Sequence, residues 1–328
     1  MKNLIDLHIH LDGSIPLRTA RRLAKLEGLN SIDDTELRQR MTVPPDCPDL
    51  NAYLAAFAFP LKLLQTPEAV EITTYDLLTE LRSQGVVYAE PRFAPSSLTT
   101  SGISQEEVVE AAIAGLQRFI RDQSEDIKVH PEHPTLQAGL ILCMMRGRGE
   151  EAFRASIDTI HAAKKYLGRG VLAMDLAGAE ALFPTLEFAP LFRIIRGLDI
   201  PFTIHAGEAD GPDSIRDAIR FGASRIGHGV RCLEDPALVE LLCKKQIPLE
   251  LCPTSNIQTR IFPSFDAFPL RKLLSAGLKI TINTDNMTVS DTTLNNEFAK
   301  LKEACALTSN EVHILLTNAK EAAFTHLT

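Results

Sequence analysis

The feature that most constrains the fold is a series of short apolar runs that alternate with amphipathic segments along the 328-residue chain. Eight runs are rich in apolar residues, and several are apolar almost throughout, as parallel strands buried on both faces are. The runs are Leu4–Leu11, Val86–Phe93, Leu136–Met144, Gly170–Gly178, Pro201–Gly207, Ser224–Gly229, Ile247–Cys252 and Lys279–Asn283. Intervening helices are predicted at 67–84, 104–122, 150–166, 213–221 and 236–245.

Eight strand-then-helix units predict an α/β chain folded as a closed (β/α)8 TIM-type barrel. The alternative is an open, doubly wound sheet, which normally carries a Gly-rich phosphate turn that this sequence lacks. Residues 14–66 carry a helical pattern without a strand, so we expect extra helices inserted after the first strand. Apolar residues of this insertion either form a lid over a pocket or pack the insertion onto the barrel. They are Tyr53, Leu54, Phe57 and Phe59. We expect a single domain, 1–328.

Composition narrows the function classes. The 34 basic and 42 acidic residues give a net charge of −8, and 45% of the residues are hydrophobic. This composition is typical of a soluble globular protein and argues against disorder and against a nucleic-acid partner. No apolar stretch is long enough for a membrane span, and the N-terminus does not resemble a signal peptide. Six cysteines without a C-x-x-C pair indicate reduced thiols in a cytoplasmic protein.

Histidines and acids fall at the C-terminal ends of four predicted strands, where barrel enzymes place their chemistry. His8 and His10 share one side of the first strand, because alternate strand residues point the same way. Two imidazoles on one wall suit a divalent metal. For this motif alone, two hydrogen-bonded core histidines are an equal alternative.

Three other strand ends carry groups that fit the same site. Glu208 follows His205 beyond a glycine, where it suits acid/base work or, alternatively, an ion pair at the rim. His228 stands between two glycines, near a substrate or merely in an exposed turn. Asp285 ends an apolar strand, where an acid is hard to bury unless it is paired or metal-bound; a helix N-cap is the plainer interpretation. Taken together, the four strands predict a site of three imidazoles and one carboxylate, which zinc occupies readily.

The chain resembles the adenosine/AMP deaminase family of metal-dependent barrels nearly from end to end. Eight blocks in the family's order carry the resemblance. They are LHIHLDGS at 7–14, VVYAEPRFAP at 86–95, LCMMR at 142–146, MDLAGAE at 174–180, TIHAGE at 203–208, RIGHGV at 225–230, LELCPTSN at 249–256 and ITINTDN at 280–286.

The resemblance implies zinc-dependent hydrolytic deamination of a purine nucleoside, adenosine and 2′-deoxyadenosine, at C6. It implies one zinc ion per chain, which lowers the pKa of a water molecule towards about 7. The implied metal ligands are His8, His10, His205 and Asp285. In the implied mechanism His228 takes or orients the water proton, Asp285 also holds the nucleophile, and protonated Glu208 donates to N1.

The resemblance also implies substrate contacts and shows two departures. Asp12 would bind a ribose hydroxyl and the Gly178 N–H would meet N3, while Ser255 and Asn256 would support the metal ligands. Where the family reads T-D-D, this chain has Asn286, whose amide can donate to N7 without being protonated. Where the family reads D-L-A-G-D-E, Ala179 removes a polar side chain beside the N3 contact.

Other functions share parts of this pattern. Adenine or aminodeoxyfutalosine deaminases would use the same metal site, and Asp12 with the long insertion favours a nucleoside over a bare base. Phosphoesterases of the polymerase-and-histidinol-phosphatase type need more histidine ligands and a closing D-x-H. Binuclear amidohydrolases usually need a modified lysine on the fourth strand, where this chain has Met174-Asp175-Leu176. A binding protein with an inactive site would have lost Glu208 or a histidine ligand, and all are present.

Overall fold

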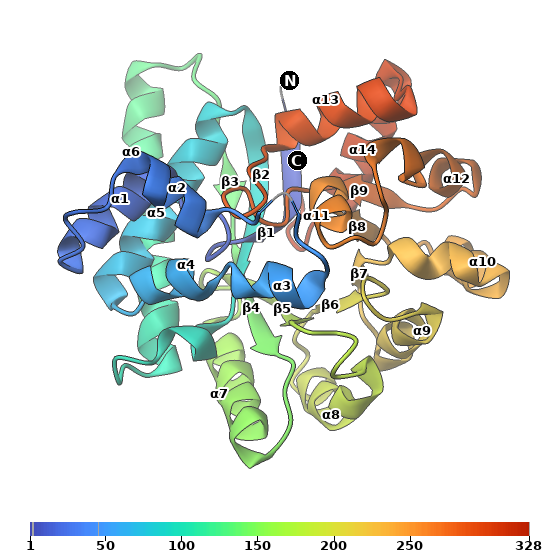
Figure 1. The fold of residues 1–328 in the computed structure, drawn as a ribbon, viewed down its shortest axis with the longest axis horizontal. Helices are drawn as coiled ribbons and strands as arrows, with labels where there is room; N and C mark the ends of the chain where they lie inside the picture. Colours follow the sequence, from blue (N-terminus) through green and yellow to red (C-terminus); the bar gives the residue numbers. More distant parts are fainter. Residues whose placement is uncertain (2, 45, 328) are drawn as a thin grey trace.

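A ring of parallel strands forms the centre of the computed structural model, which describes residues 1, 3–44 and 46–327 (Figure 1). The strands are β1 (Leu4–His10), β2 (Val86–Phe93), β3 (Gln137–Ala138), β4 (Leu140–Met145), β5 (Val171–Ala177), β6 (Thr203–Ala206), β7 (Arg225–His228), β8 (Leu249–Leu251) and β9 (Ile280–Ile282). They pair in the orders β1-β2-β4-β5 and β6-β7-β8-β9, and β3 pairs with β2. Each predicted run therefore contains a strand.

Backbone hydrogen bonds join the two sets of strands into one closed cylinder. Between β5 and β6, Met174 N donates to Pro201 O over 2.9 Å. Between β9 and β1, Asp285 N donates to His8 O over 2.8 Å, and Asp285 O accepts from His10 N over 2.6 Å. The predicted (β/α)8 barrel is confirmed. The hydrogen bonds that close it between β9 and β1 are made by predicted site residues, namely His8, His10 and Asp285.

Two predicted boundaries were wrong. The third run is divided at Gly139 into β3 and β4. A Cβ at residue 139 would lie 2.4 Å from Leu172 Cδ1, so the side chain of Leu172 in β5 packs into the space that glycine leaves open. The helix predicted at 104–122 continues to Val129, because the first strong breaker after Ser104 is Pro131, which disfavours helical geometry at the residue before it.

Most of the helices surround the strands on the outside of the cylinder, and the first four in the chain lie over one end of it (Figure 1). The helices are α1 (Leu17–Leu26), α2 (Asp34–Met41), α3 (Leu50–Ala55), α4 (Ala58–Leu63), α5 (Pro67–Ser83), α6 (Gln105–Val129), α7 (Glu150–Tyr166), α8 (Ala189–Gly197), α9 (Pro212–Phe221), α10 (Pro236–Lys245), α11 (Pro253–Gln258), α12 (Leu270–Ser275), α13 (Leu294–Cys305) and α14 (Ser309–Ala322). Within the described part of the chain, no helix combines the length and apolarity that crossing a membrane would require.

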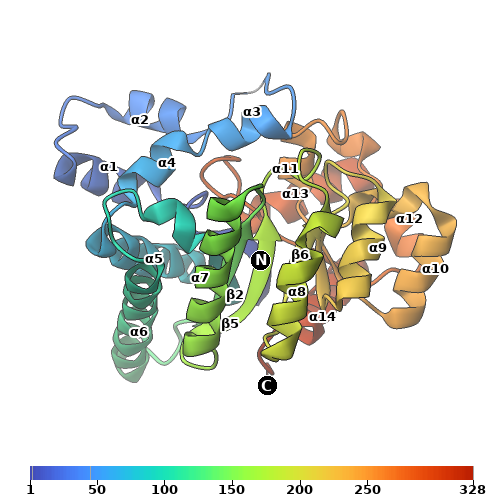
Figure 2. The ribbon, with the colours of Figure 1, turned by 90° about the horizontal axis from the view of Figure 1, so that it is seen from below.

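Helices α1 to α4 form the predicted insertion after β1 and lie together over one end of the barrel (Figure 2). Local caps begin two of them: Asp33 accepts a hydrogen bond from Glu36 N before α2, and Asp49 accepts one from Ala52 N before α3. The described residues of 14–66 contain no strand, as expected.

Strand alternation in β1 decides which side chains enter the cylinder. Ile5 and Leu7 pack with Ala319 of α14 on the outside of the barrel. His8 and His10 occupy the alternate positions of the strand, so their side chains point to the inside, as the sequence pattern predicts.

Beneath those histidines the barrel interior is charged. The Arg92 guanidinium, fully buried, lies 2.8 Å from Asp175 Oδ2 and 3.0 Å from Glu250 Oε2. Arg225 binds the other oxygen of Glu250, Oε1, over 2.5 Å, and Glu90 Oε2 over 2.6 Å. Each buried charge has an opposite partner, which is the condition under which ions are tolerated away from water.

Replacing Arg92 by Met is therefore expected to lower the free energy of unfolding by about 3–5 kcal/mol, because two buried carboxylates lose their shared cation. Urea unfolding measures the change. The matched control is Arg154→Met, which breaks an exposed pair with Glu150 and should change stability by less than about 0.5 kcal/mol. Equal losses in the two variants would contradict the stabilising role of the network.

Candidate active site

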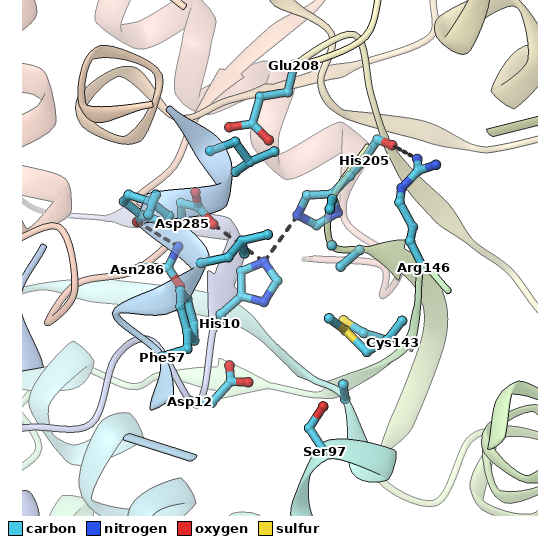
Figure 3. Close-up of a pocket in the computed structure, with 18 of the residues that line it drawn as sticks. His10, Asp12, Phe57, Ser97, Cys143, Arg146, His205, Glu208, Asp285 and Asn286 are labelled. Carbon is cyan, nitrogen blue, oxygen red and sulfur yellow. Dashed lines mark hydrogen bonds and ion pairs between the residues drawn. The ribbon is translucent and has the colours of Figure 1, made fainter. Parts of the chain in front are cut away.

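A pocket of about 300 Å³ opens between the C-terminal ends of the strands and the inserted helices (Figure 3). One wall carries the polar groups of the strand ends, and the wall that faces it carries apolar side chains of the insertion. The polar residues include His10, Asp12, Arg146, His205, Glu208, His228, Asp285 and Asn286. The side chains from the insertion are Leu50, Tyr53, Leu54, Phe57 and Leu61. The insertion thus covers the pocket as a lid through Tyr53, Leu54 and Phe57. Phe59 is instead partly buried and packs against the main core.

Imidazoles and a carboxylate from three strands converge at the base of this pocket. His10 Nε2 lies 3.2 Å from His205 Nε2 and 3.4 Å from Asp285 Oδ1. His8 Nε2 lies 3.5 Å from the same oxygen of Asp285. Ligands that share one tetrahedral zinc ion are about 3.3 Å apart when each sits about 2.0–2.1 Å from the metal. The donor set and its spacing therefore fit a divalent ion.

The four side chains His8, His10, His205 and Asp285 are brought together as predicted, and His228 joins them. The potential ligand atoms of His8, His205, His228 and Asp285 all lie within 4.8 Å of one another. Geometry alone therefore does not decide whether His10 or His228 is the fourth metal ligand. His8 Nε2 is buried and has no hydrogen-bond partner among the described residues, as a nitrogen reserved for a metal should be.

Two buried acids orient the imidazoles from behind. Glu250 Oε2 lies 2.7 Å from His8 Nδ1, and Asp175 Oδ2 lies 2.9 Å from His205 Nδ1. An acceptor at Nδ1 keeps the hydrogen on that nitrogen and leaves the Nε2 lone pair free for a cation. Arg146 adds a hydrogen bond to the His205 carbonyl over 2.6 Å. These contacts connect the site to the charged barrel interior.

Asp285 and His228 both adopt the left-handed backbone region, with φ of 59° and 58°. Non-glycine residues are uncommon there, and strain of this kind concentrates at functional sites. Burial opposes ionisation of Asp285, but the hydrogen bond and charge of His8 hold its pKa well below the usual value. Burial lowers the pKa values of His10, His205 and His228, which favours neutral imidazoles.

The pKa of Glu208 shifts in the opposite direction to that of Asp285. Burial, followed by the negative charges of Asp285 and Glu180, raises its pKa well above the usual value, which favours the protonated carboxyl. Its Oε2 lies 3.6 Å from His228 Nε2. A protonated carboxyl beside a neutral imidazole can donate a proton into the pocket.

The turn that carries Glu208 is held by a single buried carboxylate. Glu180 Oε1 accepts from Gly207 N over 2.7 Å. Its Oε2 accepts from the backbone N–H of Glu208, Ala209 and Asp210 over 2.8–3.0 Å. Four main-chain donors on one anion fix the direction in which the Glu208 side chain leaves the strand.

The remaining predicted residues also line or support the pocket. Asp12 lies in the wall, and burial raises its pKa to about 6. Gly178 and Asn286 lie in the same wall. Asn256 Nδ2 lies 3.2 Å from His228 Nδ1, so this residue contacts the predicted proton-handling histidine, which was not among the predicted metal ligands. Ser255 is buried.

Comparisons with known proteins agree with this geometry. A family model described as adenosine deaminase matches residues 4–327. The adenosine deaminase of Haemophilus ducreyi is 44% identical over 326 residues, covering 98% of this chain and 91% of the relative. The chain belongs to the adenosine deaminase family. Its buried histidine and aspartate cluster can hold the metal on which this family of hydrolases depends.

Solved structures show the same fold. An adenine deaminase from Arthrobacter aurescens has a TM-score of 0.85 at 24% identity, covering 99% of this chain and 94% of that one. The N6-methyl-AMP deaminase of Arabidopsis thaliana has a TM-score of 0.81 at 26% identity, covering 99% and 92%. The barrel with its inserted helices is thus shared across deaminases named for different purine substrates.

Sequence reasoning missed three acids on which this adenosine deaminase family site depends, namely Asp175, Glu180 and Glu250. The available signal was a charged residue inside an otherwise apolar predicted strand or directly after one. That signal could have predicted buried acids, but not their partners, because the histidines they orient come from other strands. Tyr53 was noted only as an apolar lid residue, and its hydroxyl contacts were not foreseen.

Replacing Asp175 by Asn is expected to weaken divalent-metal binding about 10- to 100-fold, with Zn²⁺ as the probe, because His205 loses the carboxylate that orients it. Competition with a chromophoric chelator measures the affinity. Asp158→Asn on the exposed face of α7 is the control and should bind zinc like the unchanged protein. Unaltered affinity in Asp175→Asn would contradict the orienting role.

Proposed function

We propose that this chain catalyses zinc-dependent hydrolytic deamination of adenosine, and of 2′-deoxyadenosine, to inosine and 2′-deoxyinosine with release of ammonia. The observation that carries the proposal is the arrangement at the pocket base, where a cluster suited to a metal lies beside a buried Glu208 whose pKa is raised. Membership of the adenosine deaminase family supports the same reaction. We also propose that residues 1–328 act as one domain, since the insertion supplies one wall of the pocket.

For the metal we propose zinc, held by His8, His10, His205 and Asp285. Imidazole nitrogens with one carboxylate oxygen are ligands that zinc favours. When bound, zinc supplies a Lewis acid that makes water a nucleophile at neutral pH. We assign His228 to proton handling instead, because it is the histidine that lies beside Glu208.

Three residues of the chain then handle protons and charge. Glu208 donates its proton to N1 of the purine, so that the ring accepts electrons as C6 becomes tetrahedral. His228 takes the proton of the attacking water at Nε2, and Asp285 orients that water. His228 then gives this proton to the 6-amino group as the C6–N bond breaks, so that ammonia leaves. To accept at Nε2, His228 must carry its hydrogen on Nδ1. The amide oxygen of Asn256 accepts that hydrogen after a half-turn of the carboxamide.

The opposite wall binds the rest of the nucleoside. We propose that Asp12 accepts a hydrogen bond from a ribose hydroxyl, that the N–H of Gly178 meets N3, and that Asn286 meets N7. All three residues line the pocket. The apolar side chains of Leu54 and Phe57 on the insertion cover the ligand from the other side and exclude water.

The lining favours a nucleoside over a nucleotide. Among the described residues that line the pocket, Arg146 is the one with a permanent positive charge. Its guanidinium donates to the carbonyls of Phe183 and His205 and to Thr185 Oγ1, so both terminal nitrogens are already engaged. A 5′-phosphate would therefore be desolvated without a free cation to bind it.

We propose the cytoplasm as the site of action. All six cysteines are free thiols in the structure, and five of them are buried. Reduced thiols of this kind are ordinary in a reducing compartment.

Loss of the adenine chromophore measures the reaction. Adenosine and 2′-deoxyadenosine are expected to be turned over with kcat/KM at least about 100-fold above that of AMP, since one unpaired buried phosphate costs more than about 3 kcal/mol. Adenine and aminodeoxyfutalosine are assayed beside them. Faster turnover of either one would replace adenosine as the substrate while retaining the metal chemistry.

Glu208→Gln is expected to lower kcat about 10²- to 10⁴-fold, because the amide cannot give a proton to N1. Ammonia release measures the rate, and the zinc content should stay near one per chain. Glu234→Gln, an exposed acid in a pair with Arg231, is the matched control and should retain full activity. An active Glu208→Gln variant would refute the assigned proton donor.

A further inference from the structure

A polar contact joins the inserted helices to the residue beside Asp285. Tyr53 lies on α3, and its hydroxyl accepts a hydrogen bond from Asn286 Nδ2 over 2.9 Å. The same hydroxyl lies 2.6 Å from Ser290 Oγ. Tyr53 and Asn286 are each 2% exposed, so the contact is sealed from water. If the contact were lost, the buried tyrosine hydroxyl and the asparagine N–H would each lack this partner, which is costly away from water.

Donor and acceptor counting shows what the contact does to the amide. A phenol has one hydrogen, so when Tyr53 accepts from Asn286 it can give its own hydrogen to Ser290. The NH2 group of Asn286 has two hydrogens, and Tyr53 takes one of them. The second N–H is left for a ligand in the pocket that Asn286 lines.

The amide oxygen is placed on the side away from Tyr53. Asn286 Oδ1 is buried and has no hydrogen-bond partner among the described residues. It occupies space beside Gly13, where a Cβ would lie 1.8 Å from it. A half-turn of the amide would exchange oxygen and nitrogen, and the pocket would then meet an acceptor in place of a donor. Purine N7 is itself an acceptor, so that orientation would repel it.

We propose that Tyr53 is a positioning residue that determines purine specificity. Its hydroxyl holds the Asn286 carboxamide so that one N–H is available to N7. The position of α3 over the pocket therefore affects recognition of the base. The proposal rests on the proposed function, in which Asn286 meets N7. Figure 3 shows where Asn286 lies among the residues that line the pocket.

The test compares the inhibition constants of inosine and 7-deazainosine, which has C–H in place of N7. The unchanged enzyme is expected to bind inosine about fivefold more tightly, the ordinary worth of one neutral hydrogen bond. In Tyr53→Phe this ratio should fall towards one. Phe57→Leu alters the same wall of the pocket, so it should weaken both inhibitors alike and keep the ratio. A wild-type ratio in Tyr53→Phe would overturn the proposal, even if both inhibitors bound more weakly.

A second variant decides the matter if Tyr53→Phe does not fold. In the double variant Ser255→Ala/Ser290→Ala the tyrosine hydroxyl loses both neighbouring serine hydroxyls and is driven to donate to the amide oxygen, so the ratio should again fall towards one. Retention of the ratio would overturn the proposal. A ratio near one in the unchanged enzyme would also overturn it. The proposed function is tested separately, by the turnover of adenosine and the competing substrates by the zinc-loaded enzyme.

Discussion

The buried ion pairs below the pocket are the constraint on which the site depends. Arg92 lies between Asp175 and Glu250, and these two acids face His205 and His8. Each acid therefore has two tasks: to neutralise a buried guanidinium and to fix an imidazole. Charges this deep cost several kcal/mol each unless they are paired. The geometry of the histidines thus follows from charge neutralisation inside the barrel, because neither acid can move without leaving a buried ion alone.

Above this network, backbone strain and main-chain contacts aim the reactive side chains. Asp285 is held in its left-handed conformation by the two hydrogen bonds that close the barrel between β9 and β1. The turn after His205 is held by the four N–H groups that Glu180 accepts. Strained or irregular backbone persists only where its surroundings determine it strongly. Closure of the cylinder is therefore part of how the site is built.

The inserted helices complete the pocket with a different chemistry. The barrel supplies charged and polar groups, whereas the insertion supplies mainly apolar surface, with the Tyr53 hydroxyl reaching Asn286. Such a division suits a nucleoside, whose base needs a few directed hydrogen bonds and otherwise an apolar cover. The two parts meet at the contact between Asn286, which follows β9, and Tyr53 of the insertion.

The sequence alone indicated the barrel, the helical insertion, and the histidines and acids at four strand ends, because alternation and apolar runs report which residues are inside a strand and where each strand ends. Asp12, Gly178 and Asn286 came from the resemblance to the deaminase family. The end of α6 was also readable from Pro131, whereas the division at Gly139 was not, because Leu172 of β5 approaches it only in the folded barrel. Only the tertiary structure decided which acids orient which histidines, and that Tyr53 bonds to Asn286. Those contacts join positions up to 242 residues apart, as His8 and Glu250 are, and no local pattern encodes a partner that is brought near only when the cylinder closes.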